Sequence, residues 1–222
     1  MQSTQDLIII GSPRGKGSNS WFLAQIFIKG HNKHKSWSPE VIFLNQKKAL
    51  DAQLEAFKNA QRIFLFFPLY TDAMPAIVKC FMENLTADDF KGKKMGLFII
   101  SGFPEAYHSI FVEKYFLKLT KKYDAQCVGS AIKGGMENVM EQPRWMSRST
   151  RKDVALLGAA IAQKGHFDSK ITAKLRMMMH LSPVVVFMLR LMKRLNLTDR
   201  YWNKNLKKNE ALERRYDQPY AK

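Results

Sequence analysis

Cysteine is scarce in this sequence, and long apolar runs are absent. Cys80 and Cys127 are its two cysteines among 222 residues, so at most one disulfide could form and a disulfide-stapled fold is excluded. The longest apolar-like run late in the chain is residues 181–189, which still contains a serine and a proline. A membrane-spanning helix needs about 20 predominantly apolar residues. The sequence therefore predicts a protein that is not integral to a membrane.

A secretion signal is not visible either. Met1 leads directly into the polar segment 2–6, without the basic and apolar regions that such signals contain. Together with the small number of cysteines, this favours the reducing cytoplasm as the compartment. With 222 residues, 46% of them hydrophobic, the chain can form one elaborated domain or two small ones around a substantial core.

Acidic residues are few, and the charge imbalance is uneven along the chain. There are 19 Asp and Glu against 36 Lys and Arg, a formal charge of +17. Residues 144–222 contain 18 basic and 6 acidic residues, a net +12, whereas residues 1–143 carry only +5. An anionic partner is therefore sought for the C-terminal third rather than for the whole molecule.

Five short apolar runs alternate with amphipathic stretches in residues 1–133. This rhythm is typical of the strands and crossover helices of a doubly wound α/β domain with a five-stranded parallel sheet. The expected strands are residues 7–10, 41–44, 63–67, 95–100 and 127–132, and the expected helices are 19–29, 52–60, 74–85 and 106–123. Ligands of such sheets bind beyond the carboxyl ends of the strands. We therefore expect the functional residues in the loops that follow the strands.

The loop after the first strand is rich in small and hydroxyl-bearing residues. Segment Gly11–Ser20 would open the first helix, where free backbone N–H groups and the positive end of the helix dipole favour an anion. Arg14 and Lys16 add positive charge, so a phosphate monoester is the expected ligand. The loop lacks both the ending of a nucleoside-triphosphate loop and the glycine spacing of a dinucleotide fold. The alternative is a flexible turn with Ser18 or Asn19 as the helix N-cap.

Two further loops complete the candidate site. Segment 68–76 combines a proline, a tyrosine and small residues, which suits a flat heterocycle. It also fits a turn in which Asp72 is an N-cap and Pro75 lies in the first helical turn. Segment 101–105 follows the fourth strand, where Gly102 would let the backbone approach a ligand closely.

Taken together, these loops resemble a known family, the flavodoxin-like NAD(P)H-dependent FMN reductases and their quinone- and azo-reductase relatives. The similarity lies in Gly11-Ser12-Pro13-Arg14 with Ser18-Asn19-Ser20, and in Pro68-Leu69-Tyr70 with Met74-Pro75. It covers about residues 6–133 and implies a flavodoxin-like fold, bound FMN, homodimerisation and electron transfer from NADH or NADPH.

The resemblance also implies a role for individual residues. By this analogy the FMN phosphate is held by Ser12, Arg14, Ser18, Asn19 and Ser20. The ribityl chain and isoalloxazine are lined by Pro68, Leu69, Tyr70, Thr71 and Met74, with Ser101, Gly102 and Phe103 on the other edge of the ring.

No side chain is expected to be catalytic, because the flavin N5 carries the chemistry of such enzymes. Glu105 and His108 could lie near the flavin edge, although a first-turn acid and a surface histidine explain them more simply. His31 and His34 lack cysteine or carboxylate companions, so no metal site is expected. The clustered cysteines of the iron–sulfur branch of the family are missing as well.

The expected function is that of an FMN-dependent oxidoreductase. It would transfer hydride from NADPH or NADH through the flavin N5 to a small acceptor, such as a quinone, nitroaromatic, azo compound or free flavin. The alternative is a flavodoxin-like electron carrier, or a membrane-surface flavoprotein, without substrate turnover of its own. Carriers of this kind are usually acidic, and the basic charge of this chain argues against that alternative.

Residues 134–222 are expected to form a basic helical extension, with helices near 149–163, 169–180 and 183–195. Three interpretations compete for it. It could pack on the domain or on a dimer partner, with Met177, Met178, Met179 and Met192 as adaptable packing. It could lie peripherally on the anionic inner face of a membrane. Nucleic-acid binding is the least favoured, because no recognition motif accompanies the charge.

Overall fold

The computed structural model describes residues 6–137, 139–140, 143–176, 179–195 and 199–218. The chain divides into two compact units, residues 1–180 and 181–222. The sequence pattern placed a boundary at residue 133, whereas the structure divides the chain at residue 180. The difference arises because α6 (Arg148–Lys164) and α7 (Ser169–Leu175) form part of the first unit.

The first unit is built on one parallel sheet, in the order β2-β1-β3-β4-β5. Its strands are β1 (Asp6–Ile10), β2 (Glu40–Phe43), β3 (Arg62–Pro68), β4 (Lys94–Ile100) and β5 (Gln126–Lys133). All five predicted strands are confirmed, and so is the doubly wound order. The strand order reverses between β1 and β3, which is the switch point where such sheets open a crevice for ligands.

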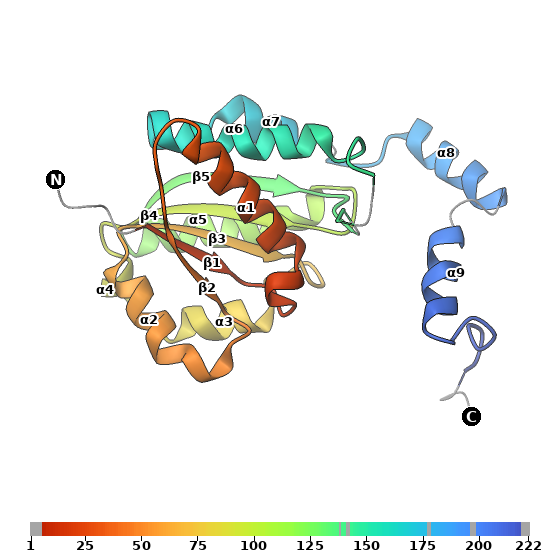
Figure 1. The fold of residues 1–222 in the computed structure, drawn as a ribbon, viewed down its shortest axis with the longest axis horizontal. Helices are drawn as coiled ribbons and strands as arrows, with labels where there is room; N and C mark the ends of the chain where they lie inside the picture. Colours follow the sequence, from red (N-terminus) through yellow and green to blue (C-terminus); the bar gives the residue numbers. More distant parts are fainter. Residues whose placement is uncertain (1–5, 138, 141–142, 177–178, 196–198, 219–222) are drawn as a thin grey trace. The chain divides into compact units, whose positions relative to one another are not determined.

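Helices cover both faces of this sheet (Figure 1). One face is covered by α1 (Asn19–Asn32), α6 and α7. The other face is covered by α2 (Leu50–Asn59), α3 (Ala76–Glu83), α4 (Ala87–Phe90) and α5 (Ile110–Lys122). Short 3₁₀ helices lie in the connections: η1 (Gly15–Gly17), η2 (Lys47–Ala49) and η3 (Tyr107–Ser109).

The apolar strands are explained by these two layers of helices. In β1, Ile8 and Ile10 point into the core shared with α1 and α6, whereas Leu7 and Ile9 point into the core shared with α2, α3 and α5. All four are at most 1% exposed. Successive side chains of a strand face opposite ways, so a central strand covered on both sides must be apolar throughout.

The crossing of α1 and α6 depends on two glycines. A Cβ atom at Gly30 would lie 1.9 Å from the carbonyl oxygen of Ala155, and one at Gly158 would lie 2.0 Å from that of Phe27. No side chain fits at either position without moving a backbone. The close approach fixes α6 against α1, and α1 begins at the loop that follows β1.

The second unit contains α8 (Pro183–Arg194) and α9 (Asp199–Lys208). The helix expected at 169–180 is shorter, ending at Leu175, while Met177 and Met178 lie outside the described residues. Met179 packs against the core of the first unit, and Met192 is exposed. Within the part of the chain that the structure describes, no helix is long and apolar enough to cross a membrane.

Candidate functional site

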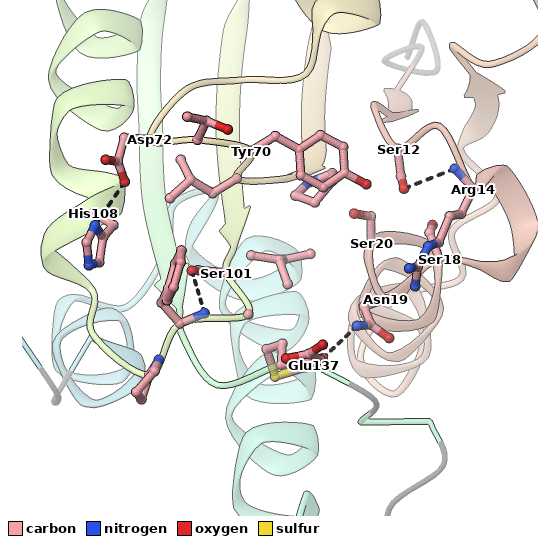
Figure 2. Close-up of a pocket in the computed structure, with 18 residues that line it drawn as sticks. Ser12, Arg14, Ser18, Asn19, Ser20, Tyr70, Asp72, Ser101, His108 and Glu137 are labelled. Atoms are coloured by element: carbon pink, nitrogen blue, oxygen red, sulfur yellow. Dashed lines mark hydrogen bonds and ion pairs between the residues drawn. The ribbon is translucent and has the colours of Figure 1, made fainter. Parts of the chain in front are cut away.

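A pocket in the first unit opens beyond the carboxyl ends of β1, β3, β4 and β5 (Figure 2). Its volume is about 850 Å³, within the range of sites that hold small molecules and cofactors. It is lined by Ser12, Arg14, Ser18, Asn19, Ser20, Pro68, Leu69, Tyr70, Thr71, Asp72, Ile100, Ser101, Gly102, Phe103, Pro104, His108, Met136 and Glu137. Twelve of the thirteen residues predicted to bind the cofactor are therefore brought together in one cavity.

Ser18 fixes the loop that carries the first group of these residues. It is the N-cap of α1: its Oγ accepts a hydrogen bond from the backbone N–H of Trp21 at 3.1 Å and donates one to the carbonyl of Gly15 at 2.6 Å. The predicted capping role is thus confirmed. Gly15 has φ +53°, and a Cβ there would lie 2.5 Å from Asn45 Nδ2, so this turn requires glycine.

Ser20 differs from Ser18. Its hydroxyl oxygen is buried and has no hydrogen-bond partner among the described residues, although the side chain lines the pocket. A buried hydroxyl without a partner is costly, so its presence needs an explanation. The backbone N–H groups of Asn19 and Ser20 are the first two of α1 and have no partner within the helix. This end of the pocket therefore offers several donors in one place.

Asn19 joins two loops across the pocket. Its Nδ2 donates to the carbonyl of Met136 at 2.6 Å, which ties the start of α1 to the segment after β5 (Figure 2). That segment is also tied to the loop after β4, because Met136 N–H donates to the carbonyl of Ser101 at 2.9 Å. These two hydrogen bonds therefore link the start of α1, the segment after β5 and the loop after β4.

The loop after β3 makes a tight reversal at the rim. Tyr70 and Ala73 exchange two backbone hydrogen bonds of 2.9 and 3.0 Å, and the two residues between them, Thr71 and Asp72, have φ of +48° and +59°. Left-handed backbone costs about 1–2 kcal/mol for a residue with a Cβ, and a β-branched threonine rarely adopts it. Strained residues of this kind concentrate at binding sites.

Asp72 is held by a contact from another element. His108 Nδ1, in η3, lies 2.9 Å from Asp72 Oδ1. The His108 ring also packs against the ring of Phe103, with 4.9 Å between centroids. The aromatic end of the pocket is thus assembled from the loops after β3 and β4 and from η3, opposite the end made by Ser12, Ser18 and Ser20 (Figure 2).

Gly102 leaves space in the pocket. A Cβ built there would make only ordinary contacts, the nearest at 3.8 Å from the Cβ of Glu137. Its backbone φ is not in the left-handed region. The fold itself therefore does not require glycine at this position, which is part of the pocket lining.

Met74 does not line the pocket, contrary to the role expected from the resemblance. Its side chain packs against the core between the sheet and α2, α3 and α5. The turn at residues 70–73 reverses the chain just before Met74 and directs that side chain inward.

Six lining residues were not predicted as ligands: Asp72, Ile100, Pro104, His108, Met136 and Glu137. From the sequence, Asp72 is explained as a helix N-cap and His108 as a surface residue, so neither was predicted to bind the cofactor. Met136 and Glu137 follow β5, so the same rule about strand ends could have found them. Glu105 does not line the pocket.

The two histidines weighed as metal ligands lie elsewhere. His31 is 2% exposed, its Nδ1 lies 3.1 Å from the carbonyl of Lys35, and its ring packs on Trp37. Burial lowers the pKa of His31 below its ordinary value. His34 is exposed and contacts Gln163. No group of three or more His, Cys, Asp or Glu side chains that could hold a metal ion occurs in the described ranges.

Several solved structures share this fold. An FMN-dependent NADH-azoreductase from Bacillus anthracis in complex with FMN aligns with a TM-score of 0.56 and 15% identity, covering 72% of this chain and 100% of its own. An NADH:FMN oxidoreductase in its apo form gives 0.56 and 17%, covering 82% and 99%. An NADPH-quinone reductase from P. pentosaceus gives 0.52 and 17%, covering 72% and 98%. At these identities the likeness concerns the fold alone.

No curated protein matches the sequence. Residues 5–129 match the protein family described as Flavodoxin-like fold. The match spans more than half of the chain and contains four of the five strands in full, together with the loops after β1, β3 and β4 that build the pocket. The chain therefore belongs to the Flavodoxin-like fold family.

Proposed function

We propose that this protein is an FMN-dependent oxidoreductase that takes electrons from NADH or NADPH. The observation that carries the proposal is the two-ended pocket. One end collects hydroxyl and backbone N–H donors at the start of α1, and the other collects aromatic rings and small residues. FMN has a phosphate at one end and a flat ring system at the other. The two ends of the pocket therefore match the two ends of FMN in their chemistry.

At the phosphate end, the donors are not equivalent. The Ser18 hydroxyl hydrogen is already donated to Gly15, so Ser18 serves the site chiefly by holding the loop. Ser20 has a buried hydroxyl with no partner among the described residues, and a phosphate oxygen would provide one. Arg14 is exposed and can add a charge-assisted contact. The residues present therefore fit a phosphate monoester.

At the ring end, Tyr70 and Phe103 are 45% and 57% exposed. Large aromatic side chains left this open at a pocket mouth suit stacking or edge contact with a planar ligand. Pro68, Leu69 and Thr71 would line the same side as Tyr70, with Ser101 and Gly102 on the other side. The open volume at Gly102 gives the ring edge room beside the backbone.

Bound FMN would supply two-electron redox chemistry at its N5 position, which accepts a hydride from a nicotinamide and passes electrons to an acceptor. The chain's own part is to hold the phosphate, to orient the ring and to keep one ring face open. Both the nicotinamide and a small acceptor, such as a quinone, azo compound, nitroaromatic or free flavin, would use that face in turn.

The solved azoreductase, oxidoreductase and quinone reductase of this fold support the proposal by analogy, since each is named for FMN, NADH or NADPH chemistry. We include homodimerisation and a cytoplasmic location in the proposal on the same analogy. Nucleic acid is not proposed as a partner.

The proposal is tested by titrating the purified full-length protein with FMN and with riboflavin. Quenching of flavin fluorescence measures the affinity. FMN is expected to bind at least tenfold more tightly than riboflavin, because only FMN carries the phosphate that several donors would hold (about 1.4 kcal/mol per factor of ten). Equal affinities would remove the phosphate end of the proposal, and failure to bind either flavin would remove the proposal altogether. A carrier would bind FMN as well, but NADH or NADPH would not reduce it directly.

A further inference from the structure

The helix α8 in the second unit has an apolar face that is exposed to solvent and that no described residue of the unit covers. No residue of α8 is buried. The apolar face of α8 is the set of exposed residues spaced three and four apart: Val184, Phe187, Met188, Leu191 and Leu195. Phe187, for example, is 67% exposed.

The local sequence explains why this segment is helical before it meets any partner. Ser182 caps it, its Oγ accepting from the backbone N–H of Val185 at 3.3 Å, and Pro183 occupies the first turn. A helix of 12 residues is nevertheless marginal in water unless its apolar face is buried. The face therefore needs a surface to pack against.

The charge of α8 indicates the chemistry of that surface. The basic side of α8 consists of Arg190, Lys193 and Arg194, all exposed. On a helical projection Lys193 falls opposite the centre of the apolar face, while Arg190 and Arg194 lie along one flank of it, and no acidic residue occurs in α8. Exposed Lys204, Lys207 and Lys208 add to this charge in α9. The second unit as a whole has ten Lys and Arg against four Asp and Glu.

Like charge disfavours two other occupants. A second copy of α8 would bring the same basic side chains together. The first unit is also basic, since residues 1–180 contain 26 Lys and Arg against 15 Asp and Glu. Both faces of its sheet are already covered by its own helices, so its core does not need α8 for completion.

We propose that α8 is an interfacial helix that lies on an anionic lipid bilayer. Its apolar face enters the boundary between headgroups and acyl chains, while Arg190, Lys193 and Arg194 remain at the level of the anionic headgroups. The long basic side chains can reach the headgroups from a helix buried along its apolar side. An oxidoreductase attached in this way would meet lipid-soluble acceptors at the membrane surface.

The test is sedimentation of full-length protein with two kinds of vesicle, phosphatidylcholine alone and phosphatidylcholine with about one-third phosphatidylserine. The protein is expected to sediment with the anionic vesicles at low ionic strength and to be released as salt is raised, because the attraction is screened. Replacing Arg190, Lys193 and Arg194 by glutamine is expected to lower the partition coefficient on the order of 100-fold. Replacing Phe187 by aspartate is expected to lower it at least about tenfold.

Matched controls come from α5 in the first unit. Phe111 is an exposed phenylalanine like Phe187, and Lys118, Lys121 and Lys122 are exposed lysines whose replacement removes the same charge. Phe111→Asp and the triple glutamine variant of these lysines are expected to sediment like the natural protein. Control variants that lose vesicle binding as strongly as the α8 variants would overturn the proposal. Net charge or non-specific hydrophobic adsorption would then explain the binding.

Other occupants of the face give different results. Protein that stays in the supernatant with anionic vesicles, or that binds both vesicle types equally, contradicts the proposal. If α8 covered the first unit or a second copy, Phe187→Asp would change the melting temperature or the sedimentation coefficient in buffer without vesicles. FMN binding, measured on the same samples, stays unchanged in all α8 variants, so failure here is distinguishable from failure of the flavin proposal.

Discussion

Asp72 and His108 are 36 positions apart in sequence, yet Asp72 Oδ1 and His108 Nδ1 lie 2.9 Å apart at the rim of the pocket. This contact joins the strained turn after β3 to η3. Because the Asp72 side chain is 59% exposed, this contact itself adds little to global stability, below about 1 kcal/mol. We expect the contact to hold the turn after β3 in position and thereby to raise the affinity for FMN.

The first prediction is a double-variant cycle on this pair. Asp72→Asn and His108→Gln are each expected to weaken FMN binding by about 1 kcal/mol, and the double variant by no more than either single one, because they share one contact. Fluorescence titration measures this. The exposed pair Lys79–Glu83 on α3, outside the pocket, is the control: Glu83→Gln leaves FMN affinity unchanged. Additive losses in the double variant would mean that the two residues act separately.

The second prediction concerns Ser20. Removal of an unpartnered buried hydroxyl is expected to stabilise the protein without FMN by about 1 kcal/mol, whereas the same change weakens FMN binding. Ser20→Ala should therefore raise the free energy of unfolding in urea and lower FMN affinity, with riboflavin affinity unchanged.

Ser130 in β5 is a matched control for Ser20. It is the site of another buried hydroxyl without a partner among the described residues, and it does not line the pocket. Ser130→Ala is expected to stabilise the protein in the same way and to leave FMN affinity intact. If Ser20→Ala left FMN affinity intact as well, the phosphate would have to be placed elsewhere.

The third prediction uses the space at Gly102. Gly102→Val is expected to preserve the free energy of unfolding within about 1 kcal/mol, since the position has neither a left-handed φ nor a close neighbour. It should nevertheless lower FMN affinity, because the added side chain enters the volume assigned to the ring edge. Gly17→Val is the control, because Gly17 also faces open space and does not line the pocket. Unchanged FMN affinity in Gly102→Val would contradict the placement of the ring.

The fourth prediction is a pH dependence of stability from His31. Burial lowers the pKa of this imidazole in the folded state, and the positive charges of Arg62 and Lys35 act in the same direction, while Asp6 and the hydrogen bond to the Lys35 carbonyl oppose it. The unfolded chain therefore binds the proton more readily. The stabilisation from neutral His31 is complete above the unfolded pKa of about 6.5 and is lost as the pH falls through the folded value.

Urea unfolding between pH 8 and pH 5 (roughly the range in which histidine titrates) measures this effect. The free energy of unfolding is expected to fall toward the acidic end, and His31→Gln should flatten the curve. His34→Gln is the control, since His34 is exposed in the same segment. A curve that keeps its slope in His31→Gln would show that another group controls it.

The strands and the three ligand loops could be predicted because apolar runs and strand ends have direct sequence signals. Residues 63–67, for instance, are apolar at every position, and the central strand β3 is buried on both faces. Ser18 was readable as an N-cap because serine before a helical pattern has a known preference for that place.

Other features depend on contacts that the sequence does not encode locally. Threonine rarely adopts left-handed backbone, as Thr71 does here, so neither the reversal at residues 70–73 nor the packing of Met74 against the core was foreseeable. Likewise, the need for glycine at Gly30 and Gly158 arises only where α1 and α6 cross, and the sequence of either helix alone does not show it. The helix α9 contains few apolar residues, and it was not among the helices expected from the sequence.

The most direct test of the central claim is anaerobic reduction of the FMN-loaded protein, followed by its visible spectrum. The account predicts that NADH or NADPH bleaches the flavin bands in a rapid phase that saturates with nucleotide, and that an added quinone restores them. Flavin bands that persist with both nucleotides, while dithionite bleaches them, would contradict an NAD(P)H-dependent oxidoreductase and leave an electron carrier in its place.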